Sequence, residues 1–400
     1  TDQSNNFAVT GGDGSLENPG VFFLNGYKLF LKDNIEYKDQ TSSGSLDDDW
    51  YTNTALPSLT TPTGPTTSIN GADVDGTSFF SCGDSGSVAK TTDTGRNWVS
   101  KTSGTSANLN DMDMASSTTG LSVGNDGTVV RTFSGGENWS SIPPSAIPAS
   151  YRRDFYGVSF IDTGRGWVVG ESGIILYTVN TGNAWSVQSA GVTSEVLRSV
   201  HALDGTSAWA VGDNGEIIYC YDGTNWSQQS SGVTEDLNKV FASYGAVYAV
   251  GDSGTVLKTT DDGTNWNSKT SDTSANLYDV HFVGSNGWAV GADGTIINSS
   301  DAGETWDATV IKSGVDFNTV TFSDTTGFIA GSDGTVYRTL DGTSWEPYRT
   351  DYVYIDFHLA EVGSDSSVSY EYLDSSLYDS TAGTPNANRL RIVQDIKVSE

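Results

Sequence analysis

The sequence repeats itself about every forty residues, and a repeat of this length constrains the fold more than any other feature of the chain. A tryptophan marks each copy, and successive tryptophans are 41, 46, 41, 40, 40 and 39 residues apart. The seven are Trp98, Trp139, Trp185, Trp226, Trp266, Trp306 and Trp345. A G-x-x-G pair begins 14 or 15 residues before each tryptophan, at Gly83, Gly124, Gly170, Gly212, Gly251, Gly291 and Gly331. The chain therefore contains seven copies of one structural unit.

Each copy is expected to form four short strands. The copy "NLYDVHFVGSNGWAVGADGTIINSSDAGETWDATV" divides at Gly, Asn and Asp into runs that are rich in β-branched and aromatic residues and too short for helices. Four antiparallel strands repeated seven times predict an all-β fold, a β-propeller of seven four-stranded blades. One large side chain lies three residues before each turn glycine, and we expect this series to pack blade against blade: Phe80, Leu121, Trp167, Trp209, Tyr248, Trp288 and Phe328.

The two ends of the chain lie outside the repeats. We expect a β extension at 1–68, the propeller at 69–350 and a second β extension at 351–400. An alternative is an eighth blade built from both termini, with the C-terminal strand joining N-terminal ones and Trp50 filling the repeated tryptophan position.

The turn before each tryptophan has its own pattern, Ser/Thr-x-Asp-x-Gly-x-x-Trp, which is complete around Asp93, Asp261 and Asp301. It resembles the BNR or Asp-box repeat. The aspartate can accept backbone N–H groups of its own loop, and the glycine permits a positive φ. Two copies replace the aspartate and two are one residue shorter, so we expect a structural role for the box.

The whole repeat, which joins "GWAVG-x-x-G-T-I" to the box, is similar to the photosystem II stability and assembly factor type of propeller over residues 69 to about 350. The resemblance implies a seven-bladed fold and a non-catalytic assembly or docking role. A photosynthetic role need not follow, because one scaffold hosts many functions.

A glycoside-acting enzyme is the alternative function, because sialidases also carry Asp-boxes on a propeller. That resemblance implies three convergent arginines, a tyrosine nucleophile and an acid/base carboxylate. Arginine is scarce here, no sialidase-like arginine-proline motif lies near the start, and the repeats are more regular than in those enzymes. We therefore expect no catalytic residues and no cofactor.

The net charge of −30, with only 20 Lys and Arg residues, argues against binding to nucleic acid. Such an acidic composition is typical of proteins that work in very high salt, where self-repulsion is screened. An acidic surface in an ordinary medium is the alternative. No apolar run is long enough to cross a bilayer, so direct membrane insertion is not expected. The chain starts at Thr1, which leaves open whether a signal peptide was removed.

These points predict a recognition, attachment or structural module outside a halophilic cell, or on the surface of that cell or of a virus that infects one. A soluble protein of a high-salt cytoplasm is the alternative. The expected partner is a protein or a surface glycan, within a larger assembly.

Strand parity places the G-x-x-G turns and the connections between blades on the same face of a propeller. The turns carry one acidic residue per blade, which predicts a ring of carboxylates on that face: Asp84, Asp126, Glu171, Asp213, Asp252, Asp293 and Asp333. The ring could bind cations or a basic partner, but we favour the simpler interpretation that it solvates the surface in high salt.

The longest connection, residues 140–157, lies on the same face and contains three prolines. Long stiff loops with Tyr and Arg are common recognition sites, so it is the predicted interface. The candidate binding residues are Tyr151, Arg152, Arg153, Arg165 and Arg198. A packed insertion without a binding role is the alternative.

Metal sites are not predicted. His201 and His281 share a register on the first strands of non-adjacent repeats, where they could line the central channel, but we favour ordinary packed or solvated histidines. Cys82 and Cys220 belong to different repeats, so no disulfide is expected.

Overall fold

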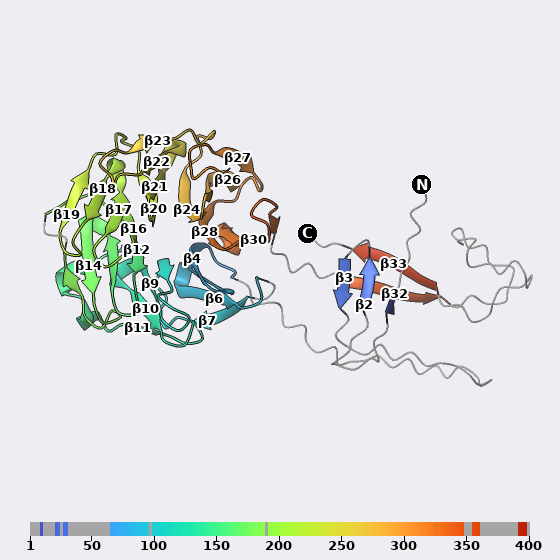
Figure 1. Ribbon diagram of the computed structural model, residues 1–400. Coiled ribbons are helices and arrows are strands. Elements are labelled where there is room, and N and C mark those ends of the chain that lie inside the picture. Colours follow the sequence, from blue (N-terminus) through green and yellow to red (C-terminus); the bar gives the residue numbers. More distant parts are fainter. Residues whose placement is uncertain are drawn as a thin grey trace, which may run out of the picture. The chain divides into compact units, whose positions relative to one another are not determined.

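The computed structural model describes residues 9–10, 21–24, 27–30, 65–95, 98–188, 191–347, 354–360 and 391–397 of the chain. Within 65–347 the chain forms seven separate four-stranded sheets, the blades of a propeller (Figure 1). Each blade consists of four consecutive strands in the order of the sequence, and all neighbouring strands are antiparallel. The seven-bladed all-β fold that the repeat predicts is confirmed.

The strands of the first four blades are as follows. Blade 1 comprises β4 (Ile69–Asp75), β5 (Ser78–Gly83), β6 (Ser87–Thr91) and β7 (Val99–Thr102). Blade 2 comprises β8 (Leu109–Asp113), β9 (Gly120–Gly124), β10 (Val129–Thr132) and β11 (Trp139–Ser141). Blade 3 comprises β12 (Phe155–Phe160), β13 (Gly166–Gly170), β14 (Ile174–Thr178) and β15 (Ser186–Val187). Blade 4 comprises β16 (Leu197–Ala202), β17 (Ala208–Gly212), β18 (Ile217–Cys220) and β19 (Trp226–Gln229).

The last three blades follow the same plan. Blade 5 comprises β20 (Leu237–Ser243), β21 (Ala246–Gly251), β22 (Val256–Thr259) and β23 (Asn267–Ser268). Blade 6 comprises β24 (Leu277–Val283), β25 (Asn286–Gly291), β26 (Thr295–Ser299) and β27 (Asp307–Val310). Blade 7 comprises β28 (Phe317–Ser323), β29 (Thr326–Gly331), β30 (Val336–Thr339) and β31 (Glu346–Pro347). The first strand of each blade contacts the first strand of the next, so these seven inner strands surround the axis of the ring.

The strands described at the two ends of the chain do not join the propeller sheets. The strands β1 (Val9–Thr10), β2 (Val21–Leu24) and β3 (Tyr27–Phe30) form a three-stranded sheet of their own. Farther along, β32 (Tyr354–Ala360) pairs only with β33 (Arg391–Lys397). The alternative of an eighth blade, with C-terminal and N-terminal strands in one sheet, is therefore wrong. Trp50 lies outside the described residues.

Each G-x-x-G pair forms a one-turn 3-10 helix between the second and third strands of a blade. These turns are η1 (Asp84–Gly86), η2 (Asn125–Gly127), η5 (Glu171–Gly173), η6 (Asp213–Gly215), η7 (Asp252–Gly254), η8 (Ala292–Gly294) and η9 (Ser332–Gly334). Both glycines of a pair are required by close contacts. A Cβ on Gly83 would lie 2.0 Å from the carbonyl oxygen of Ser68, and Gly86 has a φ of +72° with its Cβ position 2.2 Å from the carbonyl oxygen of Thr105.

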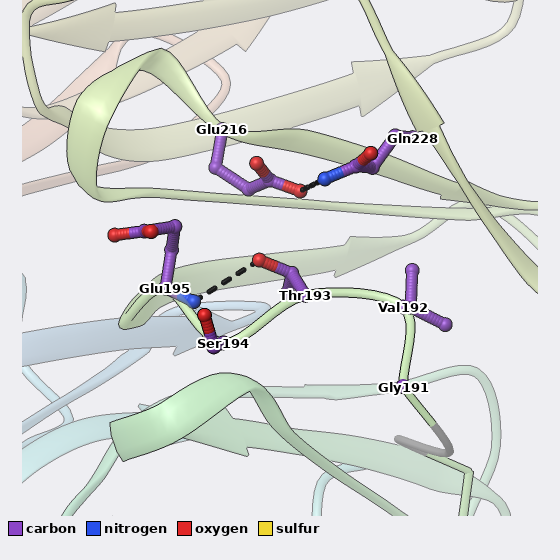
Figure 2. A pocket seen from close by; sticks show the side chains of 7 residues that line it. All are labelled: Gly191, Val192, Thr193, Ser194, Glu195, Glu216 and Gln228. Carbon is purple, nitrogen blue, oxygen red and sulfur yellow. Dashed lines mark hydrogen bonds between the residues drawn. The ribbon is translucent and has the colours of Figure 1, made fainter.

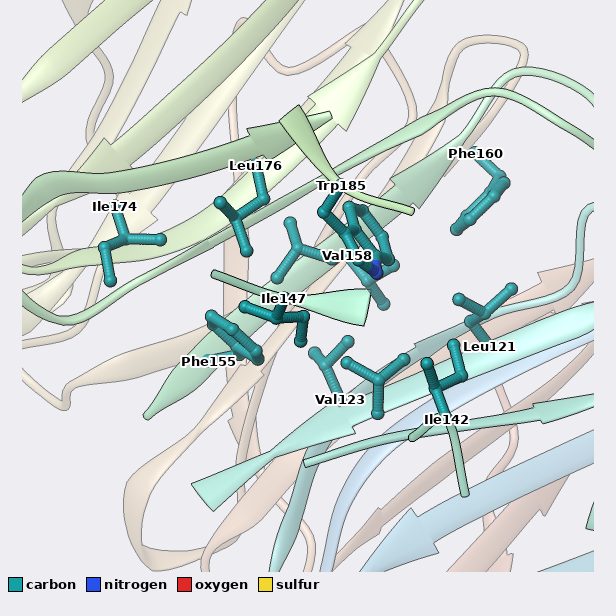
Figure 3. Close-up of a cluster of buried hydrophobic side chains, with 12 residues drawn as sticks. Leu121, Val123, Ile142, Ile147, Phe155, Val158, Phe160, Ile174, Leu176 and Trp185 are labelled. Carbon is teal, nitrogen blue, oxygen red and sulfur yellow. The ribbon is translucent and has the colours of Figure 1, made fainter. Parts of the chain in front are cut away.

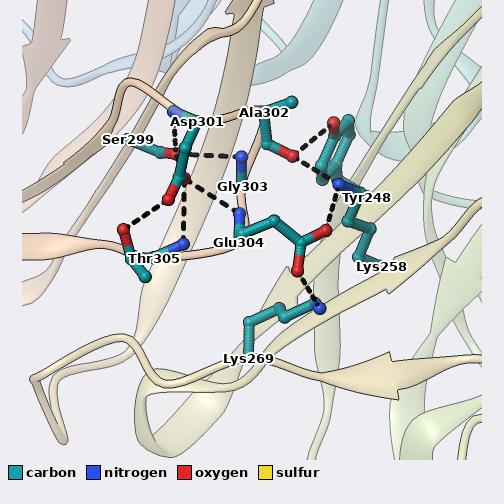
Figure 4. Close-up of polar contacts among 9 residues, drawn as sticks. All are labelled: Tyr248, Lys258, Lys269, Ser299, Asp301, Ala302, Gly303, Glu304 and Thr305. Atoms are coloured by element: carbon teal, nitrogen blue, oxygen red, sulfur yellow. Dashed lines mark hydrogen bonds and ion pairs between the residues drawn. The ribbon is translucent and has the colours of Figure 1, made fainter.

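The Asp-box is a hydrogen-bonded turn, as Figure 4 shows for blade 6. Asp301 Oδ1 accepts the N–H groups of Glu304 and Thr305 at 3.1 and 2.9 Å. The hydroxyl of Ser299 donates to Asp301 and accepts the N–H of Gly303 at 2.9 Å. The side-chain bonds from Thr305 lower the pKa of the Asp301 carboxyl well below its ordinary value. The box therefore fixes its own loop and leaves no carboxylate oxygen of Asp301 without a donor.

The other copies keep this turn with different residues. Asp261 accepts from the backbone and side chain of Asn265 at 2.9 and 2.7 Å, and Asp93 accepts from the hydroxyl of Thr91 at 2.8 Å. Ser134 replaces the aspartate in blade 2 and accepts the N–H of Asn138 at 2.9 Å. A serine can therefore replace the aspartate as acceptor of one backbone N–H group of the turn. Such tolerance is expected of a structural role.

No blade has a hydrophobic core of its own. The buried apolar residues form seven clusters, and each cluster draws on two neighbouring blades. Figure 3 shows the cluster between blades 2 and 3, where Leu121 and Val123 of one blade meet Phe155, Val158 and Leu176 of the next. The apolar surface that one blade buries therefore belongs partly to its neighbour.

The predicted series of large side chains supplies these contacts. Tyr248 stacks on Phe282 of the next blade, and Trp288 stacks on Phe322, with ring centroids 3.8 Å apart in both pairs. The ring of Tyr248 also covers the box glycine of blade 6, because a Cβ on Gly303 would lie 2.7 Å from its Cε1 atom. The box glycine thus provides room for the aromatic residue of the preceding blade, as well as a positive φ of 76°.

The ring closes between blade 7 and blade 1 without any exchange of strands. Phe328 of blade 7 packs on Phe79 and Trp98 of blade 1, with centroids 4.3 and 5.7 Å apart. Arg338 donates to the carbonyl oxygen of Thr94 at 3.1 Å. The seam is therefore held by the same kinds of contact that join every other pair of blades.

Several lysines form ion pairs that join adjacent blades. Lys258 and Lys269 of blade 5 both reach Glu304 in the box of blade 6, at 2.7 and 2.6 Å (Figure 4). The same arrangement joins blades 1 and 2, where Lys90 and Lys101 reach Glu137 at 2.8 and 2.6 Å. These lysines stabilise the ring and are not available to a partner.

Two further expectations concern membranes and cysteines. No helix among the described residues is long and apolar enough to cross a membrane. Cys82 and Cys220 are both free and buried.

The contact between a box glycine and the preceding blade gives a stability prediction. Gly303→Ala should lower the free energy of unfolding by about 2 to 4 kcal/mol, because the new methyl group meets the Tyr248 ring in a left-handed backbone conformation. Gly314→Ala is the matched control, since Gly314 has a φ of +79° and nothing within 4 Å of its Cβ position. It should cost only about 1 to 2 kcal/mol. Equal losses in urea unfolding would contradict the proposed contact.

Candidate functional site

The two faces of the propeller carry different turns. Because each blade runs antiparallel, the 3-10 turns and the blade-to-blade connections lie on one face, which we call the turn face. The Asp-box turns and the hairpins between first and second strands lie on the opposite face, the box face. The inner strands run from the turn face to the box face.

The long connection between blades 2 and 3 is a packed element of the turn face. It forms two 3-10 turns, η3 (Pro144–Ala146) and η4 (Ala149–Tyr151). Ile142 and Ile147 are buried in the cluster of Figure 3, and Tyr151 packs against that cluster. Tyr151 therefore points inward, and it is not the free recognition aromatic that we predicted.

The two arginines after Tyr151 are exposed and make local contacts. Arg152 Nε donates to the carbonyl oxygen of Ile147 at 3.0 Å, and Arg153 Nη1 donates to Ser172 Oγ at 3.2 Å. Both bonds are to neutral groups of the turn face. These guanidinium groups therefore keep their positive charge free of a carboxylate partner in the described part of the chain.

The remaining two candidate arginines lie elsewhere. Arg165 sits in the hairpin between β12 and β13 on the box face, where its Nε donates to Asp162 at 2.7 Å. Arg198 lies on inner strand β16 and pairs with Asp213 and with Asp236, the latter at 3.0 Å. The prediction that five residues contribute to one interface is therefore wrong, because Arg165 lies on the opposite face and Tyr151 is packed.

The predicted acidic residues all lie on the turn face, but they occupy two different positions of the turn. Asp84, Glu171, Asp213 and Asp252 are the first residues of their turns. The other three, Asp126, Asp293 and Asp333, are second residues with left-handed φ values between 53 and 56°. The seven carboxylates therefore share the predicted face, one from each blade, but they do not occupy equivalent positions in their turns.

A hollow of about 450 Å³ lies at the axis on the turn face, and we call it the axial mouth. Every blade contributes the second residue of its inner strand. These seven residues are Asn70, Asn110, Tyr156, Arg198, Asn238, Tyr278 and Asn318. Asp252 and Asn276 complete the lining. At the axial mouth, all seven repeats therefore present residues of the same register around one hollow.

Each of the four asparagines of this register ties its blade to the next one. Asn70 Nδ2 donates to Asp84 Oδ1 and to the carbonyl oxygen of Leu109, both at 3.0 Å. Asn238 Nδ2 makes the equivalent bonds to Asp252 and Leu277, both at 2.9 Å. The corresponding bonds in the other blades run from Asn110 to Asn125 and Phe155, and from Asn318 to Ile69.

A second set of bonds between blades lies beside the mouth. The N–H at the left-handed position of one turn donates to an Asn or Asp just before the inner strand of the next blade. The acceptors are Asn108, Asp154, Asp236, Asn276 and Asp316, at 2.8 to 3.0 Å. These contacts fix the positions of the polar side chains around the mouth.

Below the mouth, an ion pair crosses the axis. Lys239 of blade 5 lies 3.3 Å from Asp111 of blade 2 and 3.8 Å from Asp279 of blade 6. Burial opposes the charge of the lysine, but the two carboxylates outweigh burial and raise its pKa above the ordinary value. Lys239 is therefore a permanently charged ammonium held by carboxylates from both sides of the ring.

Two further carboxyl groups, on β4 and β8, face the axis nearer the box face. Burial raises the pKa of Asp113 to about 7, and Asp111 adds to the shift. Burial and repulsion by Asp113 also hold the pKa of Asp73 well above its ordinary value. Both groups accept N–H bonds from the next blade, Asp73 from Met114 at 2.6 Å and Asp113 from Phe160 at 2.7 Å. The pair is therefore incompletely ionised near neutral pH.

The two histidines lie across from this pair, on the inner strands of blades 4 and 6. Phe241 of blade 5 separates them, with ring centroids 5.0 Å from His201 and 5.3 Å from His281. Burial, with a contribution from Lys239, lowers the pKa of His201 to about 4. Among the described residues, no group of three or more His, Cys, Asp or Glu side chains has a geometry that could hold a metal ion.

A second hollow, of about 430 Å³, lies at the rim of blade 4 and is lined by seven residues (Figure 2). Its polar groups bind one another: Gln228 donates to Glu216 at 3.0 Å, and the Glu195 N–H donates to Thr193 at 3.0 Å. Glu195 also accepts from Asn214 at 2.8 Å. Because the polar groups of this rim already hydrogen-bond to one another, the axial mouth is the better candidate site.

Most of the mouth residues were not predicted from the sequence, although a signal for them exists. Aligning the repeats on the first apolar residue of each inner strand places asparagine at the next position in four of the seven copies. A polar residue repeated at one register of an inner strand is the signal that would have located the mouth. Two residues of the mouth were among the predicted site residues, Arg198 as a binding candidate and Asp252 as a member of the acidic ring.

The raised pKa of Asp113 gives a pH prediction. Its ordinary value is 3.8 and its folded value is about 7, so it favours the folded state below pH 3.8 and loses that contribution as the pH rises toward 7. Asp113→Asn can still accept the Phe160 N–H but cannot ionise. The stability of the variant relative to wild type should therefore increase between about pH 4 and pH 8 in urea unfolding.

Asp307→Asn, on exposed strand β27, is the control for this measurement. A relative stability of Asp113→Asn that stays constant across the pH range, or changes as it does in the control, would contradict the raised pKa.

Comparison with known proteins supports the fold and identifies the family. The family model described as Photosynthesis system II assembly factor YCF48 matches residues 102–240 and 272–351, more than half of the chain. No curated protein sequence matches the chain.

Solved structures share the fold at low sequence identity. The structure described as YCF48 bound to D1 peptide has a TM-score of 0.59 and 22% identity, and the match covers 69% of this chain and 94% of that one. YCF48 from Cyanidioschyzon merolae gives 0.57 and 18%, with 70% and 97% covered. The WD40 propeller domain of Doa1 gives 0.56 and 15%, with 69% and 93% covered. The family match and the seven-bladed fold agree: the chain belongs to the YCF48 family of photosystem II assembly factor propellers.

Proposed function

We propose that this protein is a non-catalytic docking propeller that holds a segment of a partner protein at the axial mouth. The observation that carries the proposal is the convergence of one polar side chain from every blade on a single hollow of about 450 Å³. Hollows of this size accommodate a few residues of a peptide. The hydrogen bonds between blades hold the lining side chains in place, so little ordering is required on binding.

The side chains of the site favour binding over catalysis. Three of the described arginines, Arg131, Arg165 and Arg338, are engaged in separate parts of the ring and do not form the convergent set that a sialidase-like site requires. Arg131 binds the box of blade 3, Arg338 binds Thr94 across the seam, and Arg165 pairs with Asp162 on the box face. Asp73 and Asp113 are both engaged with backbone N–H groups of the neighbouring blade. The glycoside-acting alternative therefore gains no support from the geometry.

The related structure supports a protein segment as the ligand, because that YCF48 is described as bound to a peptide. Its identity to this chain is only 22%, so we extend the general mode of binding and not the D1 partner. For this chain the proposal is assembly or attachment through an exposed segment of a protein partner.

We further propose that the protein works in high salt, outside a halophilic cell or on the surface of that cell or of its virus. Two observations support this proposal: the net charge is −30, and four lysines form ion pairs with glutamates of adjacent blades. Most surface charge left over is negative, and salt screens repulsion between such charges.

Binding at the mouth can be tested by capture of partner proteins from the source organism in molar salt. Tyr156→Ala with Tyr278→Ala should abolish capture of a specific partner, because both rings line the mouth. Tyr221→Ala with Tyr244→Ala is the matched control, since these tyrosines are 58% and 82% exposed and lie in box-face turns. It should bind as wild type does.

Arg152→Ala with Arg153→Ala tests the connection that the sequence indicated. Loss of the partner in this variant, with capture unchanged in the mouth variant, would move the interface to that connection and contradict docking at the mouth.

The high-salt proposal predicts a dependence of stability on salt. The thermal unfolding midpoint should rise as KCl increases from about 0.1 M to about 1 M, where the Debye length falls from about 10 Å to about 3 Å. Differential scanning calorimetry over this series checks the prediction. A midpoint that is unchanged or falls with salt would show that repulsion between surface carboxylates does not limit stability.

A further inference from the structure

The asparagines of the axial mouth present their oxygens as acceptors. In Asn70, Asn110 and Asn238 the Nδ2 group donates two hydrogen bonds to the blades, which uses both N–H groups of each amide. The Oδ1 atom of such an amide is then the group left for a ligand. No donor from the described residues reaches the Oδ1 atoms of these three asparagines.

The charge around the mouth is negative. Asp252 is part of the lining, and Asp84 and Asp213 lie in the adjoining turns as partners of mouth residues. Arg198 is the one cation of the lining, and it is shared between Asp213 and Asp236. A carboxylate ligand would therefore meet repulsion and few free donors, whereas a cation would meet acceptors and attraction.

The axis already holds a cation of this kind. The ammonium of Lys239 lies below the mouth between Asp111 and Asp279, with a half-buried side chain that is 27% exposed. The structure thus stabilises an ammonium at the axis by carboxylates from non-adjacent blades. Nearer the surface, the mouth also surrounds the axis with acceptors, here asparagine oxygens and the carboxylate of Asp252. Its lining residues include no lysine that could fill this position.

We infer that the axial mouth recognises a basic segment, in which the ammonium of a lysine or the guanidinium of an arginine inserts among the asparagine oxygens. The inference rests on the proposed function, because it names the chemistry of the segment that docks there. These side chains are donors only, so they match a ring of acceptors. Tyr156 and Tyr278 add aromatic faces that can pack on the cation.

The experiment selects ligands without assuming a partner. The immobilised full-length chain is panned against a random heptapeptide phage library in about 0.5 M KCl, which limits long-range attraction to the acidic surface. The selected peptides are synthesised, and their Kd values are measured by fluorescence anisotropy. We expect Lys or Arg in the selected peptides, and we expect replacement of that lysine or arginine by norleucine to weaken binding at least about tenfold.

Two composition-matched variants separate the mouth from the general charge of the protein. Tyr156→Arg with Tyr278→Arg places cations in the mouth, at a register that already accommodates Arg198 in blade 4. Tyr221→Arg with Tyr244→Arg changes the net charge equally on the box face. The first pair should weaken the selected peptides at least about tenfold and the second by less than about twofold. Circular dichroism spectra of both variants are the control for folding.

Each other outcome decides against a stated part of the idea. Peptides that need the mouth but are insensitive to the norleucine change would overturn the inference and leave docking at the mouth intact. Equal losses in the two variants would show general attraction between opposite charges and would also overturn the inference. Peptides that bind without regard to the mouth, or failure to select any peptide, would contradict both the inference and docking at the mouth.

Discussion

The structure depends on apolar packing between neighbouring blades. Each blade contributes one large side chain, such as Tyr248 or Trp288, to the core that it shares with the next blade. A single blade cannot bury this surface alone, because its four strands form one thin sheet. The blades are therefore stable only as a ring, and the repeated turn glycines and Asp-boxes set the spacing at which each side chain reaches its neighbour. The box glycine shows this coupling directly, since the ring of Tyr248 occupies the place where Gly303 would have a side chain.

The fold could be predicted because its determinants recur at fixed spacing within one repeat. The glycine pair, the box and the large apolar residue each lie within one repeat of about forty residues, so each can be recognised from that repeat alone. The site was harder, because its contacts join residues of different repeats. Asn70 gains its role from the carbonyl oxygen of Leu109, and Arg165 and Arg198 are close in sequence but lie on different faces. Tyr151 was misjudged since an insertion with prolines looks the same in sequence whether it packs inward or not. The acidic turn residues were grouped together although the sequence shows that three of them lie one position later in the turn; the left-handed φ of that position is seen only in the structure.

The distribution of charge links stability to recognition. Lysines at the outer strands bind Glu137 and Glu304 of the next blade, and Lys239 is enclosed at the axis. The chain has few cations, and these contacts engage several of those in the described part of the chain, whereas Arg152 and Arg153 are exposed and bind only neutral groups. The turn face therefore presents mainly carboxylates and amide oxygens around the axial mouth. The partner that we propose supplies a cationic side chain. The low number of cations in the chain therefore explains both the acidic surface and the basic ligand that fits it.

Closure of the ring by packing alone has a consequence for synthesis of the protein. Each blade is made of consecutive strands, so the strands of blade 1 can begin to pair before the later blades are made, although this sheet is not stable on its own. Its seam to blade 7 must wait, because Asn318 and Ile69, which meet there, are 249 residues apart. During that interval Phe79 and Trp98 lack the cover that Phe328 provides later. Exposed apolar surface on a partly made chain promotes aggregation. The nascent propeller is therefore most in need of protection, by its own charge or by a chaperone, until the last blade has been made.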